Sequence, residues 1–111
     1  MRNPGGHSSR PREDNASYDL AAAIKNIQGF KFPVQYSDMT RNYFKVTGEQ
    51  LGGELGAAML AFANDPTAEA AAERLSRESS YVGTTRTTCV VTMLKAGHAE
   101  NALPQTAQAT V

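Results

Sequence analysis

The spacing of apolar side chains predicts an amphipathic helix at residues 17–29. Leu20, Ile24 and Ile27 recur at intervals of four and three, which places them on one face of a helix. The serine at the start of this segment suits an N-cap, because its hydroxyl can accept a hydrogen bond from a free backbone N–H. The glycine at its end suits a C-terminal cap. We therefore expect the first folded element here.

Residues 30–36, FKFPVQY, alternate apolar and polar side chains with a period of two. This is the pattern of a strand with one buried face. Pro33 has no backbone N–H to donate to a neighbour, so the strand is expected at a sheet edge. After a polar connection, YFKV at residues 43–46 predicts a second short strand. The two segments together predict a hairpin.

The helical period returns in residues 47–64, where large apolar side chains recur every three or four residues. Gly52, Gly53 and Gly56 oppose a helix, because a glycine in a helix interior costs about 1 kcal/mol relative to alanine. The sequence leaves two explanations open. Either another segment approaches the backbone closely at these glycines, or the helix begins only near Glu54.

A third helix is predicted directly after the sequence NDP, with Asp65 as N-cap and Pro66 at the first helical position. Its apolar stripe consists of alanines and Leu75. Such small side chains let a neighbouring helix pack closely. We therefore expect a corner or hairpin between two consecutive helices.

Residues 81–97, YVGTTRTTCVVTMLKAG, hold the densest run of β-branched and apolar side chains in the chain. Their β propensity favours a strand over residues 84–96. A helix stays open as the alternative, because Lys95 and Gly97 suit a helix C-terminus. In either form Cys89 is expected to be a small buried side chain, since apolar and β-branched residues flank it.

These elements predict an α+β fold, a small single domain over residues 17–98 with about three helices packed on a short antiparallel sheet. An all-α bundle is the alternative, with residues 84–96 as a fourth helix. Residues 1–16 and 99–111 hold too few apolar side chains to offset the entropy lost on ordering. We therefore expect a flexible N-terminal arm and a flexible C-terminal tail.

Composition narrows the class of protein. A chain of 111 residues can form one modest core. Eleven basic and eleven acidic side chains cancel, so no overall field attracts nucleic acid or an anionic membrane. The single cysteine cannot form an internal disulfide, and no stretch is long and apolar enough for a signal peptide or a membrane span. A cytoplasmic protein without a membrane partner is expected.

No constellation of residues predicts catalysis, a metal or a cofactor. His7 and His98 lie far apart in the sequence, and neither has a partner at the spacing typical of zinc ligands. The glycines around residue 52 are accompanied by glutamates and no lysine, which argues against a phosphate-binding loop. The sequence therefore predicts a protein that is not an enzyme.

Protein binding is the preferred hypothesis for function. We expect an accessory protein, inhibitor or regulator of bacterial or mobile-element (phage or plasmid) origin that occupies a partner's surface. Clustered exposed aromatics are typical interface anchors, and an edge strand can pair with its own copy, so a homodimer is the expected assembly. The predicted partner-binding residues are Phe30, Phe32, Tyr36, Arg41, Tyr43 and Phe44.

A nucleic-acid-binding regulator is the alternative. Arg2, Arg10 and Arg12 lie in the arm, and Arg41 and Lys45 lie beside the predicted hairpin. Basic side chains interleaved with aromatics can contact phosphates and stack on bases. The zero net charge disfavours this function, because a basic surface dominates affinity for nucleic acid.

Overall fold

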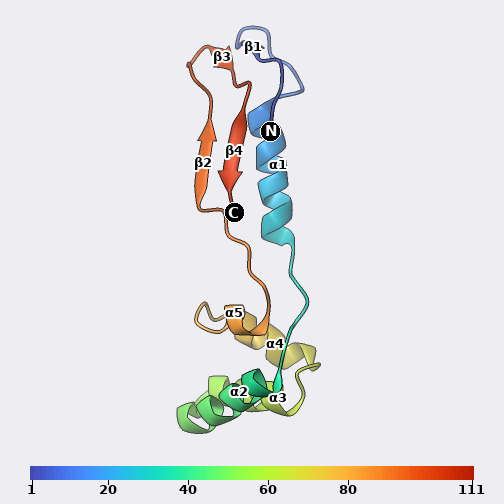
Figure 1. The fold of residues 1–111 in the computed structure, drawn as a ribbon, viewed down its shortest axis with the longest axis vertical. Coiled ribbons are helices and arrows are strands. Elements are labelled where there is room, and N and C mark those ends of the chain that lie inside the picture. The colour runs from blue at the N-terminus through green and yellow to red at the C-terminus, as the bar shows by residue number, and fades with distance from the viewer. The chain divides into compact units, whose positions relative to one another are not determined.

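The computed structural model describes residues 1–111 and divides the chain into two compact units (Figure 1). The first unit consists of Met1–Phe30 and Cys89–Val111, and the second of Lys31–Thr88. Together they contain five helices and two antiparallel sheets of two strands each. The predicted mixed α+β class is confirmed, although the structure has five helices where about three were expected.

In the first unit, α1 (Ala16–Gly29) confirms the predicted N-terminal helix. Its N-cap is Asn15, whose side-chain oxygen accepts a hydrogen bond from the backbone N–H of Ser17 at 2.9 Å. Ser17, the residue predicted to be the cap, is instead the donor within the first turn. Asn15 and Ala16 are both buried, so the start of the helix is fixed by packing as well as by its cap.

The strands β2 (Met93–Ala96) and β4 (Ala107–Thr110) pair antiparallel, with Ala96 opposite Ala107. β4 also contacts α1, and Ala107 is fully buried. The backbone of Ala107 exchanges two hydrogen bonds with Met1. Its N–H donates to the Met1 carbonyl at 2.9 Å, and its carbonyl accepts from the Met1 amino group at 2.7 Å. β4 therefore has neighbours on both sides, whereas β2 has only β4.

Two very short strands join the ends of the chain. β1 (Gly6–His7) pairs antiparallel with β3 (Ala102–Leu103). Backbone pairing therefore joins parts of the two segments that were expected to be flexible, residues 1–16 and 99–111. The flexibility of both ends in solution, and the predicted domain limits, stay predictions.

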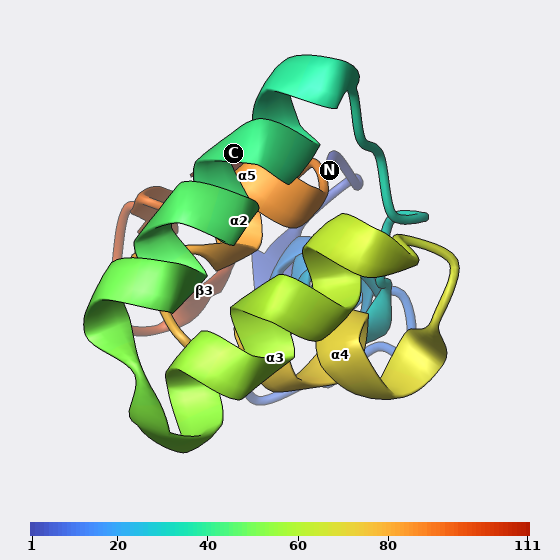
Figure 2. The ribbon, with the colours of Figure 1, turned by 90° about the horizontal axis from the view of Figure 1, so that it is seen from below.

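The second unit contains only helices, namely α2 (Asp38–Leu51), α3 (Gly53–Asn64), α4 (Glu69–Ser76) and the single turn α5 (Val82–Thr85). Seen from below, α3 lies between α2 and α4 (Figure 2). α2 begins where the Ser37 hydroxyl accepts a hydrogen bond from the backbone N–H of Thr40. The segment predicted as one helix over residues 47–64 is thus split between α2 and α3.

The glycines explain this split and the close packing of α2 and α3. A Cβ atom added to Gly56 would lie 2.7 Å from the carbonyl oxygen of Gly48, and one added to Gly48 would lie 2.8 Å from the carbonyl oxygen of Gly56. Gly52 and Gly53 both have φ of +66°, a conformation that favours glycine. Both explanations offered by the sequence are therefore correct, since α2 and α3 approach closely and α3 begins at Gly53, next to Glu54.

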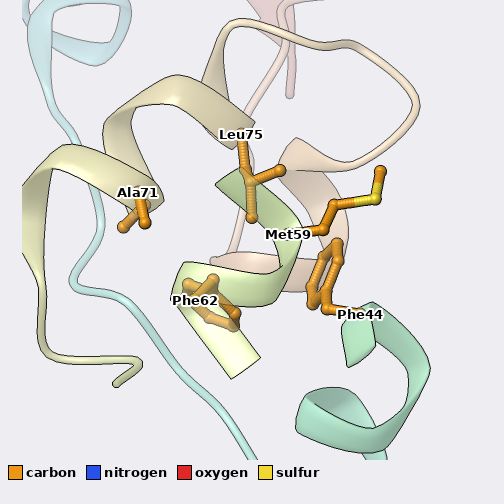
Figure 3. Packing of buried hydrophobic residues seen from close by; sticks show 6 residues of the cluster. Phe44, Met59, Phe62, Ala71 and Leu75 are labelled. Carbon is orange, nitrogen blue, oxygen red and sulfur yellow. The ribbon is translucent and has the colours of Figure 1, made fainter. Parts of the chain in front are cut away.

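Three helices of the second unit share one core. Figure 3 shows Phe44 of α2, Met59 and Phe62 of α3, and Ala71 and Leu75 of α4 gathered around a common centre. All of these except Ala71 are fully buried. The rings of Phe44 and Phe62 meet edge to face with centroids 5.1 Å apart, a favourable arrangement for aromatic pairs. The apolar stripes predicted for residues 47–64 and for the helix after NDP are confirmed at these positions. The start predicted for the latter helix is wrong, because Asp65 is the C-cap of α3 and α4 begins at Glu69 with Ala68 as its N-cap.

The predicted hairpin of residues 30–36 and 43–46 is wrong. Residues 31–37 form neither helix nor strand, and a backbone hydrogen bond joins the N–H of Gln35 to the carbonyl of Thr85. Residues 43–46 belong to α2, where the helical turn directs Phe44 into the core. Residues 30–36 therefore form no strand despite their alternating pattern. Their expected partner, residues 43–46, is part of a helix that buries Phe44 in the core.

The prediction of a long buried strand over residues 84–96 is also wrong. Only β2, its last four residues, is a strand, and all four side chains are exposed. α5 ends at Thr85, and residues 86–92 belong to no element. The boundary between the two units falls between Thr88 and Cys89, so this segment connects units rather than filling a core. Cys89 is accordingly exposed and not buried.

Candidate functional site

The edge strand β2 presents unpaired backbone groups and exposed apolar side chains. Met93 and Leu94 are 68% and 66% exposed. Alternate residues of a strand direct their N–H and C=O groups to opposite sides, and only β4 pairs with β2. We call the side of β2 that faces away from β4 the free edge. Such an edge is a template on which another strand can pair.

The two faces of β2 differ in how they are covered. Residues opposite one another in a strand pair lie on the same face, so Leu94 shares a face with its partner Ala109 and with Ala107. Ala107 is fully buried on the face that α1 covers, but Leu94 stays two-thirds exposed. α1 therefore covers β4 and leaves the apolar side chain of β2 uncovered beside it.

A second cluster of polar groups surrounds His7, a residue that the sequence analysis assigns to the arm and to no site. Its Nδ1 accepts a hydrogen bond from the backbone N–H of Ser9 at 3.1 Å and lies 2.8 Å from the Ser9 Oγ. Because Nδ1 accepts, the neutral ring carries its proton on Nε2 and can donate from there. The signal in the sequence was the pair of glycines before a histidine, followed by a serine two residues later.

The same cluster borders a shallow depression of about 590 Å³, lined by Gly5, Gly6, His7, Ser9, Arg10 and Arg12. The Arg12 guanidinium donates two hydrogen bonds to the carboxylate of Asp14, at 2.8 and 2.9 Å. These hydrogen bonds lower the pKa of the Asp14 carboxyl, since they favour its charged form.

The six predicted partner-binding residues differ in their exposure. Phe30 and Tyr36 are largely exposed, and Phe32 is half-buried beside a cavity. Tyr43 is 44% exposed on α2, whereas its neighbour Phe44 is fully buried in the core. Partner binding by the exposed members of this set stays a prediction.

Arg41, the sixth of these residues, has a structural function in this fold. Its Nε donates to the carbonyl of Ala63 at 2.8 Å, and its Nη2 donates to the carbonyl of Asn64 at 3.2 Å. These carbonyls belong to the last turn of α3 and have no partner within the helix. The guanidinium of Arg41 thereby caps α3, and the basic residues of the nucleic-acid hypothesis are divided between the two units.

The chain contains no group of three or more His, Cys, Asp or Glu side chains placed to hold a metal ion. None of its helices has the length and apolar character needed to cross a membrane.

Comparison with known proteins gives one match. A family model described as the peptidase dimerisation domain matches residues 1–111. No curated protein and no solved structure matches the chain. The family is defined by association between chains, so the match supports a homodimer or another protein partner.

This match corrects the function expected from the sequence. A regulator, inhibitor or accessory protein of phage or plasmid origin is the wrong class, because the match covers the whole chain and points to the dimerisation domain of a peptidase. Binding of nucleic acid stays a prediction. The expectation of a homodimer is consistent with the match. The edge strand that suggested it was placed at residues 30–36, whereas the edge strand of the structure is β2.

Proposed function

Because the chain belongs to the peptidase dimerisation domain family, we propose that it joins two copies of a peptidase through the free edge of β2. The observation that carries this proposal is the combination, in one strand, of an unpaired backbone edge with the exposed side chains of Met93 and Leu94. Two copies of this strand, related by a twofold axis, would pair antiparallel and make one continuous sheet.

The energetics favour such a joint. Fully burying a Met or Leu side chain contributes about 1.5–3 kcal/mol, and a twofold axis buries each residue twice. Association costs about 4–15 kcal/mol in lost freedom of motion. Apolar burial and the added backbone hydrogen bonds, each worth about 0.5–1.5 kcal/mol, are therefore both needed. Lys95, a charged residue typical of exposed edges, limits pairing with unrelated strands.

The first prediction tests this joint with two matched methionine variants. Met93→Lys is expected to convert a dimer into a monomer, because it places a charge where the partner's strand must be buried. Met39→Lys is the control, since Met39 is 83% exposed on α2, outside the proposed joint. Sedimentation equilibrium over a range of concentrations measures the association of each protein.

The proposal requires a dimer for the natural chain and for Met39→Lys. A natural chain that sediments as a monomer at every concentration would refute it. So would a Met93→Lys variant that dimerises as tightly as Met39→Lys.

A further inference from the structure

The second unit contains a cavity that dimerisation through β2 does not use. It has a volume of about 430 Å³ and lies between residues 31–34, α4 and Arg86. This volume is within the range of about 300–1,000 Å³ that is typical of small-molecule sites. Apolar and charged side chains both line it, namely Phe32, Pro33, Val34 and Ala72 on one hand and Lys31, Glu69, Glu73 and Arg86 on the other.

Arg86 has an unsatisfied donor. Its Nε is buried and has no hydrogen-bond partner. A buried N–H without an acceptor is costly, and most such groups in native proteins find one. Nε and one Nη of a guanidinium form a planar fork that matches the two oxygens of a carboxylate. An acceptor brought by a ligand would therefore satisfy Arg86 in a way that the chain itself does not.

The other charged side chains of the cavity do not occupy the Arg86 donor. The Glu73 carboxylate accepts a hydrogen bond from the Lys31 Nζ at 2.8 Å. This hydrogen bond lowers the pKa of Glu73, and the positive charges of Arg86 and Arg77 contribute to the lowering. The lining therefore holds two cations, Lys31 and Arg86, and two carboxylates, Glu69 and Glu73. Lys31 is already paired with Glu73, so Arg86 is the cation with a donor left for a ligand.

We propose that this cavity binds a carboxylate carried on a small apolar body, with the guanidinium of Arg86 holding the carboxylate. The apolar wall receives the body of the ligand, and one guanidinium with an unsatisfied donor suits a monoanion better than a phosphate group. A small apolar acid and the C-terminal residue of a peptide both present this chemistry. All residues that line the site belong to the second unit, whereas β2 belongs to the first.

The test is a titration of the natural chain followed through the NMR signals of its arginine Nε–Hε groups, with the Arg86 signal assigned by the Arg86→Lys variant. N-acetyl-leucine supplies a carboxylate on an apolar body, and N-acetyl-leucinamide is the same body without the charge. The acid is expected to shift the Arg86 signal in a saturable way, and the amide is not. Both ligands are compared on the natural chain, and the variant serves only to assign the signal.

Two further comparisons test whether Arg86 binds the carboxylate and whether the ligand is a peptide end or a small acid. Arg86→Lys keeps the charge but loses the fork, so it should weaken binding by roughly tenfold. Arg77→Lys, outside the cavity lining, should leave binding unchanged. A peptide ending in leucine that binds more tightly than N-acetyl-leucine would identify a peptide end as the source, and the reverse order a small acid. Equal shifts from acid and amide, no saturable shift, or equal binding by both variants would overturn the proposal.

Discussion

At the residue scale, two glycines decide how closely α2 and α3 can approach. A side chain of even one carbon at Gly56 would lie within 2.7 Å of the Gly48 carbonyl oxygen, which is backbone and cannot rotate away. The cost of these glycines to helix propensity is therefore offset by tight packing next to Met59 and Leu60.

The second prediction follows from this contact. Gly56→Ala should destabilise the protein by about 1–2 kcal/mol, because overpacking at a backbone contact costs more than alanine gains in helix propensity. Gly83→Ala is the matched control, since an added Cβ there meets nothing within 4 Å. Urea unfolding followed by circular dichroism measures both. Equal stability of the two variants would show that the helices can separate without loss.

Cys89 gives the third prediction, also at this scale. The exposed thiol should react with a thiol reagent in the native protein as readily as after unfolding. Cys89→Ser should change the free energy of unfolding by less than about 0.5 kcal/mol, as is usual for surface positions. Labelling only in denaturant would mean that the thiol is buried, as its apolar neighbours in the sequence suggest.

At the scale of elements, helices were predictable and strands were not. Helix signals are local, because the apolar spacing lies within one segment, and α1, α3 and α4 all carry it. The caps were not predicted, since α1 is capped by Asn15, and α3 and α4 begin without a side-chain cap. A strand depends on a partner that the sequence does not identify. The alternating residues 30–36 have no partner strand, whereas β4, with the sequence AQAT, is a strand because Met1 and β2 flank it.

The type of the candidate site could be predicted from the sequence, but its position could not. The sequence suggested an edge strand that pairs with its own copy, and the structure has one, but in β2 rather than at residues 30–36. The exposure of Met93 and Leu94 could not be foreseen, because a run of apolar and β-branched residues is typical of a buried strand. The polar cluster of His7 was missed because its segment has too few apolar residues to suggest order.

The fourth prediction distinguishes the two residues that suit the N-cap of α1. Asn15→Ala should cost about 0.5–2 kcal/mol, because its side chain accepts the hydrogen bond from Ser17 N–H. Ser17→Ala should cost much less, since that backbone N–H is retained. Thermal unfolding of both variants measures the difference. A larger loss for Ser17→Ala would restore the cap expected from the sequence.

At the scale of the whole molecule, the second unit is formed by one continuous segment, whereas the first is formed by two segments from opposite ends of the sequence. Every residue of the core around Phe44, including the partly buried ones such as Val34 and Tyr81, lies within residues 31–88. The first unit depends instead on contacts between the two ends, such as α1 with β4 and β1 with β3.

The fifth prediction is that residues 31–88 fold when they are produced alone. Their helices and their aromatic core are complete within this segment, although a domain of this size has only a small margin of stability. The isolated segment should show a helical circular dichroism spectrum and a cooperative thermal transition. A spectrum of an unfolded chain would mean that the core requires the first unit.

The division of the chain also sets an order of events during synthesis. α1 leaves the ribosome long before β4, the strand that it contacts, has been made, whereas the second unit is complete by residue 88. Since units generally fold as their residues emerge, the helical unit can fold first while α1 still exposes its apolar face. Until β4 has been translated, the face of that helix that contacts β4 stays uncovered, and ribosome pausing before residue 107 would prolong its exposure.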